Sequence, residues 1–151
     1  MNDQANPESA VADLVGRRVW GAEQGHGSFL DLQFGEPRPD DPRRGAYHLW
    51  VSQCAWRIEH GGELGAGSED APERIAAALH RLDGGTVTGV TFLRPSLSTI
   101  FEFGEHRLVT FAVHTDPSEE HAEQWLLFRP DGQVLTVGPG PVWRLSPADQ
   151  P

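Results

Sequence analysis

Apolar and polar residues alternate over many short stretches of this chain. Every second residue between 30 and 34 is apolar, and similar alternation runs through 97–103 and 109–113. This spacing is typical of a β-strand that has one buried face and one exposed face. Gly104-Glu105 and Pro130-Asp131-Gly132 separate such stretches and predict hairpin turns. The pattern therefore predicts a mainly β protein.

One longer segment has helical spacing instead. Apolar residues from Ile75 to Leu82 recur three and four positions apart, which predicts a helix near 70–82. Asp70 followed by Glu73 resembles a capping box at its start. A shorter helical turn is predicted around residues 10–15. These helical segments keep an α+β class open as the alternative to a mainly β fold.

The two halves of the chain resemble each other at an offset of about 69 residues. Two short motifs and one tryptophan recur in the same order. Leu14-x-Gly16-x-x-Val19-x-Gly21 recurs as Leu82-x-Gly84-x-x-Val87-x-Gly89, and Phe34-Gly35-Glu36 recurs as Phe103-Gly104-Glu105. Trp56 is matched by Trp125. The recurrence predicts a duplicated unit, with Val19, Phe34 and Trp56 equivalent to Val87, Phe103 and Trp125. The alternative is that both halves are strand-turn-strand units drawn from one biased set of amino acids.

The repeat also predicts how the domain is organised. A single domain over residues 9–145 would contain two pseudo-repeats, at about 14–69 and 82–143, each forming an antiparallel β-meander. Each meander is expected to bury its apolar face against its twin, which gives a sandwich or a barrel-like core. Residues 1–8 and 146–151 are polar and contain prolines, so they are predicted to be flexible tails.

Composition narrows the range of partners. The formal net charge is −10, which disfavours nucleic acids and anionic membranes and leaves a basic protein as a suitable partner. All twelve basic residues are arginines, as codon bias in a GC-rich bacterial genome would produce. The sequence has no apolar run long enough to span a membrane and no basic N-terminal leader, so the chain is expected to be cytoplasmic. Its one cysteine, Cys54, is expected to remain a reduced thiol.

The strongest candidate for chemistry is a loop that contains His114, Asp116 and His121. These residue types bind metals, but their spacing matches no familiar metal site, so a solvated acidic loop is the favoured interpretation. No serine stands in a recognisable nucleophile motif. We therefore assign no catalytic, cofactor-binding or metal-binding residue and expect no cofactor.

The chain contains five tryptophans, most of which are expected in the core. Trp143 is the exception, because it lies near the end of the chain between Pro141 and Arg144. We predict Trp143 as a partner-binding residue.

Four short motifs are distributed over most of the chain, namely Leu-x-Gly-x-x-Val, Phe-x-Phe-Gly-Glu, Ser68-Glu-Asp and Trp125-x-x-x-x-Pro-Asp-Gly. In these motifs the chain resembles small uncharacterised β-rich proteins of GC-rich bacteria, some of which are similar to immunity proteins of polymorphic toxin systems. The resemblance implies a binding role and carries over no functional residue.

Three functional hypotheses follow from the sequence. The leading one is a non-catalytic binding module, of the immunity type, that neutralises a basic protein partner. The second is a small metal-dependent hydrolase that uses the loop of His114, Asp116 and His121. The third is a self-associating structural protein, which would form a homodimer through exposed strand edges.

Overall fold

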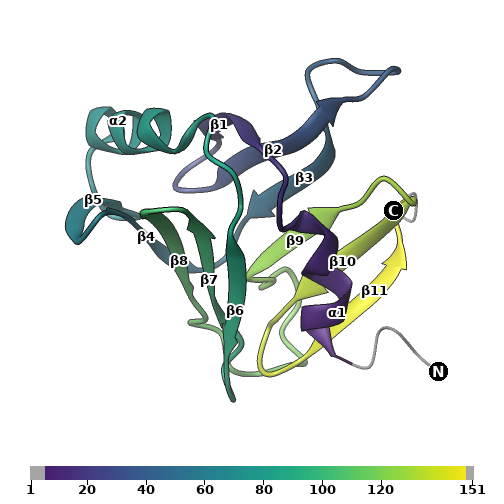
Figure 1. Cartoon of the computed structure of the whole chain (residues 1–151). Coiled ribbons are helices and arrows are strands. Elements are labelled where there is room, and N and C mark those ends of the chain that lie inside the picture. Colours follow the sequence, from purple (N-terminus) through teal and green to yellow (C-terminus); the bar gives the residue numbers. More distant parts are fainter. Residues whose placement is uncertain (1–5, 149–151) are drawn as a thin grey trace.

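Two antiparallel sheets pack face to face in the computed structural model, which describes residues 6–148 (Figure 1). The predicted mainly β class is confirmed, and so is the sandwich. Within the described residues neither sheet closes into a barrel. The open arrangement leaves an outer face on each sheet.

The larger sheet has six strands in the order β1-β2-β3-β9-β10-β11, and the smaller has five in the order β5-β4-β8-β7-β6. The strands of the six-stranded sheet are β1 (Val19–Gln24), β2 (Leu30–Pro37), β3 (Gly45–Val51), β9 (Trp125–Phe128), β10 (Gln133–Val137) and β11 (Trp143–Pro147). Those of the five-stranded sheet are β4 (Ala55–His60), β5 (Glu63–Gly67), β6 (Gly89–Leu93), β7 (Ser98–Phe103) and β8 (His106–Phe111).

Two helices lie at the open sides of the sandwich. Helix α2 (Pro72–Leu82) confirms the helix predicted near 70–82, and it packs on β1 and β5. The predicted capping box is wrong, because the N-cap is Ala71 and the Asp70 carboxylate instead accepts a 2.7 Å hydrogen bond from the Gly67 N–H. Pro72 begins the helix, where its fixed φ suits the first helical turn and its missing N–H is one that would have no partner within the helix.

Helix α1 (Pro7–Val11) and a short 3-10 turn, η1 (Ala12–Leu14), form the shorter helical segment. The helix starts before the predicted turn at 10–15 because Asn6 caps it, accepting a hydrogen bond from the Ser9 N–H. Since α1 begins at residue 7 and β11 ends at residue 147, regular structure extends beyond both predicted ends at 9 and 145. The rest of the predicted tails, at 1–5 and 149–151, lies outside the described residues.

The core consists of the inward faces of the two sheets together with the buried residues of α1, η1 and α2. Trp56 and Trp125 are both almost fully buried, as predicted. Each indole N–H is satisfied, since Trp56 donates to the Ser28 carbonyl at 2.7 Å and Trp125 donates to the Thr99 hydroxyl at 3.1 Å. Burial of a large indole therefore leaves no unpaired polar atom on either ring.

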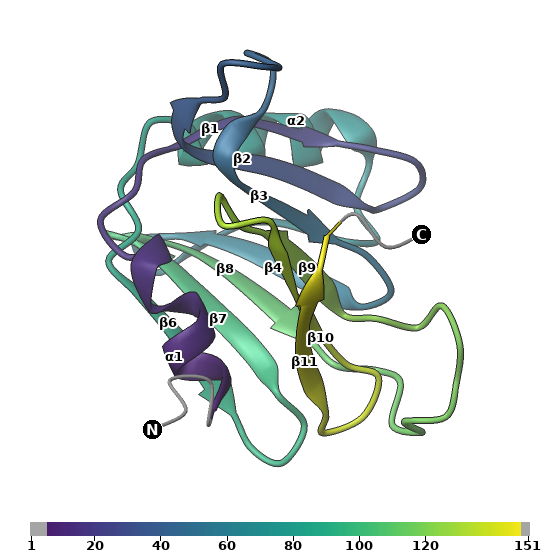
Figure 2. The same cartoon turned by 90° about the vertical axis from the view of Figure 1, so that its right-hand side faces the viewer.

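Each half of the chain contributes to both sheets (Figure 2). The first half forms a meander, β1-β2-β3, in the six-stranded sheet and then a hairpin, β4-β5, in the five-stranded sheet. The second half does the reverse, with β6-β7-β8 in the five-stranded sheet and β9-β10 in the six-stranded sheet. The halves are thus interleaved, whereas the repeat predicted that each half would form its own layer. The reason is that a hairpin from one half pairs the edge of the other half's meander, β9 on β3 and β4 on β8.

We call two residues equivalent when they occupy the same place in these matching pairings. Val19 exchanges backbone hydrogen bonds with residues 84–85 at 2.7 and 2.8 Å, and Val87 exchanges them with residues 16–17 at 2.8 and 2.9 Å. The two valines are therefore equivalent, in agreement with the predicted correspondence.

The Phe-Gly-Glu motif has a different structure in each half. Gly104-Glu105 forms the predicted tight turn between β7 and β8, whereas Gly35-Glu36 lies within β2. The β2 strand continues to Pro37, which pairs with Gly45 beyond an irregularity. The β2–β3 connection at residues 38–44 is consequently long, and it projects from the sandwich (Figure 1).

Candidate functional site

The predicted metal-ligand candidates lie in the loop between β8 and β9, and they do not converge. The His114 Nδ1 atom is 3.4 Å from a Glu119 carboxylate oxygen. Hydrogen bonds from Ser118 engage Asp116 and lower its pKa. His121 is exposed and has a positive φ of 58°. Across residues 6–148 no three His, Cys, Asp or Glu side chains are grouped so that they could hold a metal ion.

The predicted partner-binding residue, Trp143, is half-buried at the start of β11 and packs against the core. The exposed tryptophan is Trp50 on β3, with 40% of its surface accessible. The sequence carried a signal for it, because Tyr47, Leu49 and Val51 face the core, so Trp50 must point outward. Trp50 was not predicted as a site residue, because most of the tryptophans were expected in the core.

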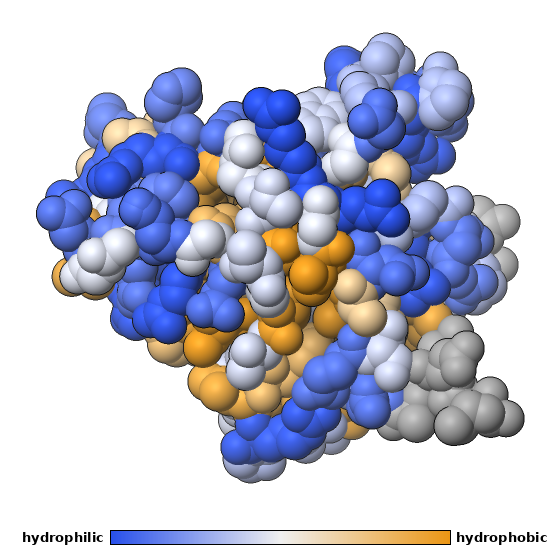
Figure 3. Space-filling model, viewed as in Figure 1, coloured by the Kyte–Doolittle hydropathy of each residue, from blue (hydrophilic) through white to orange (hydrophobic). Residues whose placement is uncertain are grey.

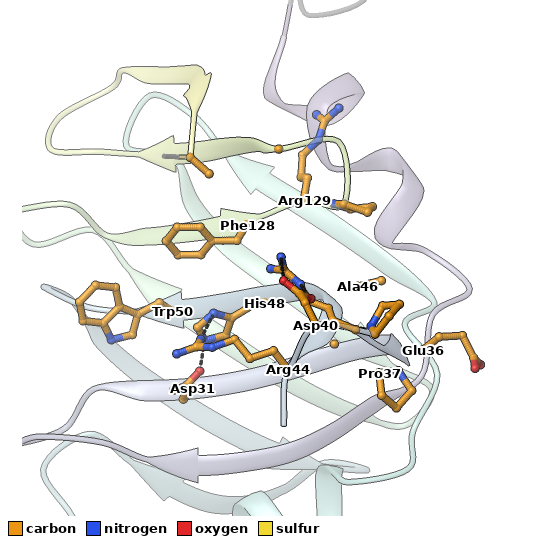
Figure 4. A pocket seen from close by; sticks show the side chains of 16 residues that line it. Asp31, Glu36, Pro37, Asp40, Arg44, Ala46, His48, Trp50, Phe128 and Arg129 are labelled. Atoms are coloured by element: carbon orange, nitrogen blue, oxygen red, sulfur yellow. Dashed lines mark hydrogen bonds and ion pairs between the residues drawn. The ribbon is translucent and has the colours of Figure 1, made fainter. Parts of the chain in front are cut away.

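Trp50 stands in a groove of about 1240 Å³ on the outer face of the six-stranded sheet. The floor is formed by side chains of the adjacent strands β3 and β9, chiefly Ala46, His48, Trp50 and Phe128 (Figure 4). One wall is the projecting β2–β3 connection, and the other is the β9–β10 turn. The groove is therefore built by segments about 80 residues apart in the sequence.

His48 occupies the centre of the floor, and both of its ring nitrogens are engaged. An Arg44 N–H lies 2.8 Å from Nδ1, and Nε2 contacts an Asp31 carboxylate oxygen (Figure 4). Because a guanidinium only donates hydrogen bonds, Nδ1 of His48 is the acceptor. The ring proton is therefore on Nε2, which donates a hydrogen bond to Asp31. The ring also stacks on Phe128, with centroids 5.5 Å apart. These contacts hold the Asp31 carboxylate in a fixed position.

The arginines that line the groove already have acidic partners. Their ion pairs are Arg38 with Asp40 at 3.2 Å, Arg44 with Asp41 at 3.7 Å, and Arg129 with Asp131 at 2.5 Å. Arg129 also donates to the Ala10 carbonyl of α1 at 2.9 Å. These cations are thus committed to contacts within the chain.

Two titratable groups are buried elsewhere. Burial raises the pKa of the Cys54 thiol to about 12, so this cysteine stays un-ionised and is a poor nucleophile. His60, at the end of β4, is 3% exposed and its Nδ1 lies 2.8 Å from that of His106. Desolvation, followed by the nearby Arg81 and His106, lowers the pKa of His60. Neither group lines the groove.

Apolar side chains are also exposed outside the groove. Figure 3 shows apolar surface on the face that carries β6, where Leu93 is 45% exposed. Leu93 does not line the groove and lies on the other sheet. It therefore offers a matched control for changes to groove residues.

In the part of the chain that the structure describes, no helix has the length and apolar character to cross a membrane. The chain matches no protein-family model, and no curated protein or solved structure is significantly similar to it. The fold and the site thus define a two-sheet β-sandwich with an aromatic-floored groove on one outer face.

Proposed function

We propose that this protein is a non-catalytic binding module that holds a protein partner in the groove over β3 and β9. The observation that carries this proposal is the exposed Trp50 on the groove floor, beside His48 and near Phe128. Large aromatic side chains in a concave surface are typical anchors of protein interfaces.

The chemistry of the groove favours binding over catalysis. Among the described residues its lining contains no serine, threonine, cysteine, tyrosine or lysine, so these residues offer none of these nucleophiles. His48 is the obvious candidate base, but both of its nitrogens are occupied by Arg44 and Asp31. A general base needs a free lone pair within reach of the substrate, so His48 is not suited to that role.

The specific form of the proposal is an immunity-type role, in which the module neutralises a basic protein. Support comes from the net charge of −10, which attracts a basic partner over long range and speeds its encounter. The same charge opposes binding to nucleic acids and anionic membranes.

Affinity capture from a lysate of the source cells tests the proposal. Wild-type protein, Trp50→Ala and the control Leu93→Ala would serve as baits at low and high salt. We expect a basic protein to be retained by wild type and Leu93→Ala, lost from Trp50→Ala, and released by salt because screening weakens charge attraction. Equal retention by Trp50→Ala would show that the groove is not the binding surface.

A further inference from the structure

We infer that an arginine side chain of the partner binds at the edge of the groove, where it stacks on Trp50 and is held by the Asp31 carboxylate and by that of Glu23, which lies opposite Asp31 beside the groove. This inference rests on the proposed function and specifies the chemistry of the partner.

The three residues lie side by side on the outer face of the six-stranded sheet. In the strand register Glu23 of β1 is opposite Asp31 of β2, and Asp31 is opposite Trp50 of β3. Two acidic side chains directly opposite each other on neighbouring strands repel and destabilise a sheet. Within residues 6–148 Glu23 has no ion-pair or hydrogen-bond partner for its carboxylate. A cation from outside the chain would relieve this repulsion.

Asp31 also keeps one acceptor free. The same oxygen, Oδ1, receives both His48 and the Gln33 amide, whereas Oδ2 has no hydrogen-bond partner among the described residues. The side chain is 33% exposed, so Oδ2 is accessible. The side-chain hydrogen bonds from Arg44 to His48 and from His48 to Asp31 fix the Asp31 carboxylate. Little conformational entropy is therefore lost when a donor binds to this carboxylate.

The unengaged charge in this region is negative. Each arginine of the groove is paired within the chain, as described above. Glu36, which lines the same groove, has no side-chain partner within residues 6–148. The complementary ligand is therefore cationic.

An arginine fits this site better than other cations. A guanidinium stacks on an aromatic face and donates a planar pair of N–H groups to carboxylates. The chain uses the same contact internally, since Arg17 lies 5.3 Å from the Tyr47 ring centroid and Arg57 lies 5.1 Å from that of Phe111. A bound metal ion is disfavoured, because no set of three ligands converges in the described chain.

An NMR titration of the whole protein with short capped peptides tests the inference. The probes are acetyl-Gly-Arg-Gly-amide, the same peptide with citrulline, which is neutral and similar in shape, and the same peptide with leucine. The readouts are the Trp50 indole N–H signal and the amide signals of residues 23, 31 and 50. We expect saturable shifts with the arginine peptide and affinity about tenfold weaker with citrulline, because the charge-assisted hydrogen bonds are lost.

Variants locate the contact. Asp31→Asn should weaken binding of the arginine peptide by about fivefold or more, and Glu23→Gln by a smaller factor. The control Glu69→Gln, at an acidic position outside the groove, should leave the affinity unchanged. Both Asp31→Asn and Glu23→Gln keep the shape of the side chain, and an unchanged amide spectrum shows that they fold.

Several outcomes would overturn the inference. Equal affinity for the arginine and citrulline peptides, or no perturbation at all, would exclude a cation site. Preferential binding of the leucine peptide at Trp50 would make the site apolar. If Trp50→Ala abolished capture of the partner while Asp31→Asn did not, the inference would fail and the proposed function would stand.

Discussion

The outer faces of the two sheets occupy equivalent places in the fold but differ in chemistry. Trp50 in β3 and Val109 in β8 are equivalent, because each lies on the strand where a meander meets the other half's hairpin. Trp50 is 40% exposed, whereas Val109 is 4% exposed. The cross-strand rows that contain them read Asp31-Trp50-Leu126 in the six-stranded sheet and Ile100-Val109-Arg57 in the five-stranded sheet.

The neighbouring row shows the same contrast. In the six-stranded sheet His48 pairs with Phe128 and stacks on it, and the floor stays open. The equivalent pair in the five-stranded sheet is Arg107 with Glu59, joined by an ion pair of 2.6 Å. Arg57 binds the same Glu59 carboxylate at 2.6 Å. These arginine stems and ion pairs cover the five-stranded face.

The connections add to the difference. The meander of the first half has the long β2–β3 connection, whereas the equivalent β7–β8 connection is a two-residue turn. Only the long connection provides a wall for the groove. The comparison shows that the two halves share a strand pairing scheme, and that the groove lies where the connection is long and the facing pair is aromatic.

The largest expected effect concerns the two buried tryptophans. Trp56→Ala and Trp125→Ala should each reduce the free energy of unfolding by about 3–5 kcal/mol, because equivalent positions in one shared core leave similar cavities. Urea denaturation measures both. Trp50→Ala should cost less than about 1 kcal/mol, since the side chain is exposed. A loss below about 1 kcal/mol for either buried tryptophan would show that the equivalence does not extend to packing energy.

A pH series distinguishes the two equivalent hairpins, because His60 at the end of β4 takes the place that Arg129 takes directly after β9. The pKa of His60 is lowered by desolvation, so the folded state binds fewer protons than the unfolded chain. Stability should therefore be full above the unfolded histidine pKa of about 6.5 and should fall as the pH decreases below it. The charges that face His60 are Arg81 and His106, which oppose its protonation, and Glu63 and Glu105, which favour it.

Denaturation between pH 7 and pH 5 measures this loss. Most of it should disappear in His60→Gln, while the control His26→Ala, in the exposed β1–β2 turn, should retain it. A flat profile in the wild type, or an unchanged slope in His60→Gln, would contradict the assignment.

The smallest effect is expected on the five-stranded face. Glu59→Gln should reduce the free energy of unfolding by about 0.5–1 kcal/mol, because its ion pairs with Arg57 and Arg107 are partly exposed. The difference from wild type should shrink in high salt. A cost above about 3 kcal/mol would mean that the ion pairs act as a buried network and not as a surface cover.

Much of the fold followed from local patterns. Alternation identified strands such as β2 and β7, helical spacing located α2, and Gly104-Glu105 marked a turn. The assignment of strands to sheets did not follow, because β3 pairs with β9 across more than seventy residues and no local pattern records that partner. Identical motifs can also adopt different structures when the segments that follow them differ in length. Phe34-Gly35-Glu36 and Phe103-Gly104-Glu105 are an example.

The groove was harder to predict than the fold. The outward direction of Trp50 was readable from the alternation in β3, but its surroundings were not. Phe128 meets His48 only through the pairing of β3 with β9, and Asp31 meets His48 only through the pairing of β2 with β3. The sequence alone drew attention to His114, Asp116 and His121 because they are close in sequence, a property that does not require their side chains to converge.

Hydrogen–deuterium exchange of the protein with and without its captured partner tests the central claim most directly, since it reports on both outer faces at once. We predict that the partner slows exchange in residues 38–51 and 125–132, which form the floor and walls of the groove, and leaves residues 98–111 of the five-stranded sheet unchanged. Protection confined to residues 98–111, with no change in the groove, would contradict the account.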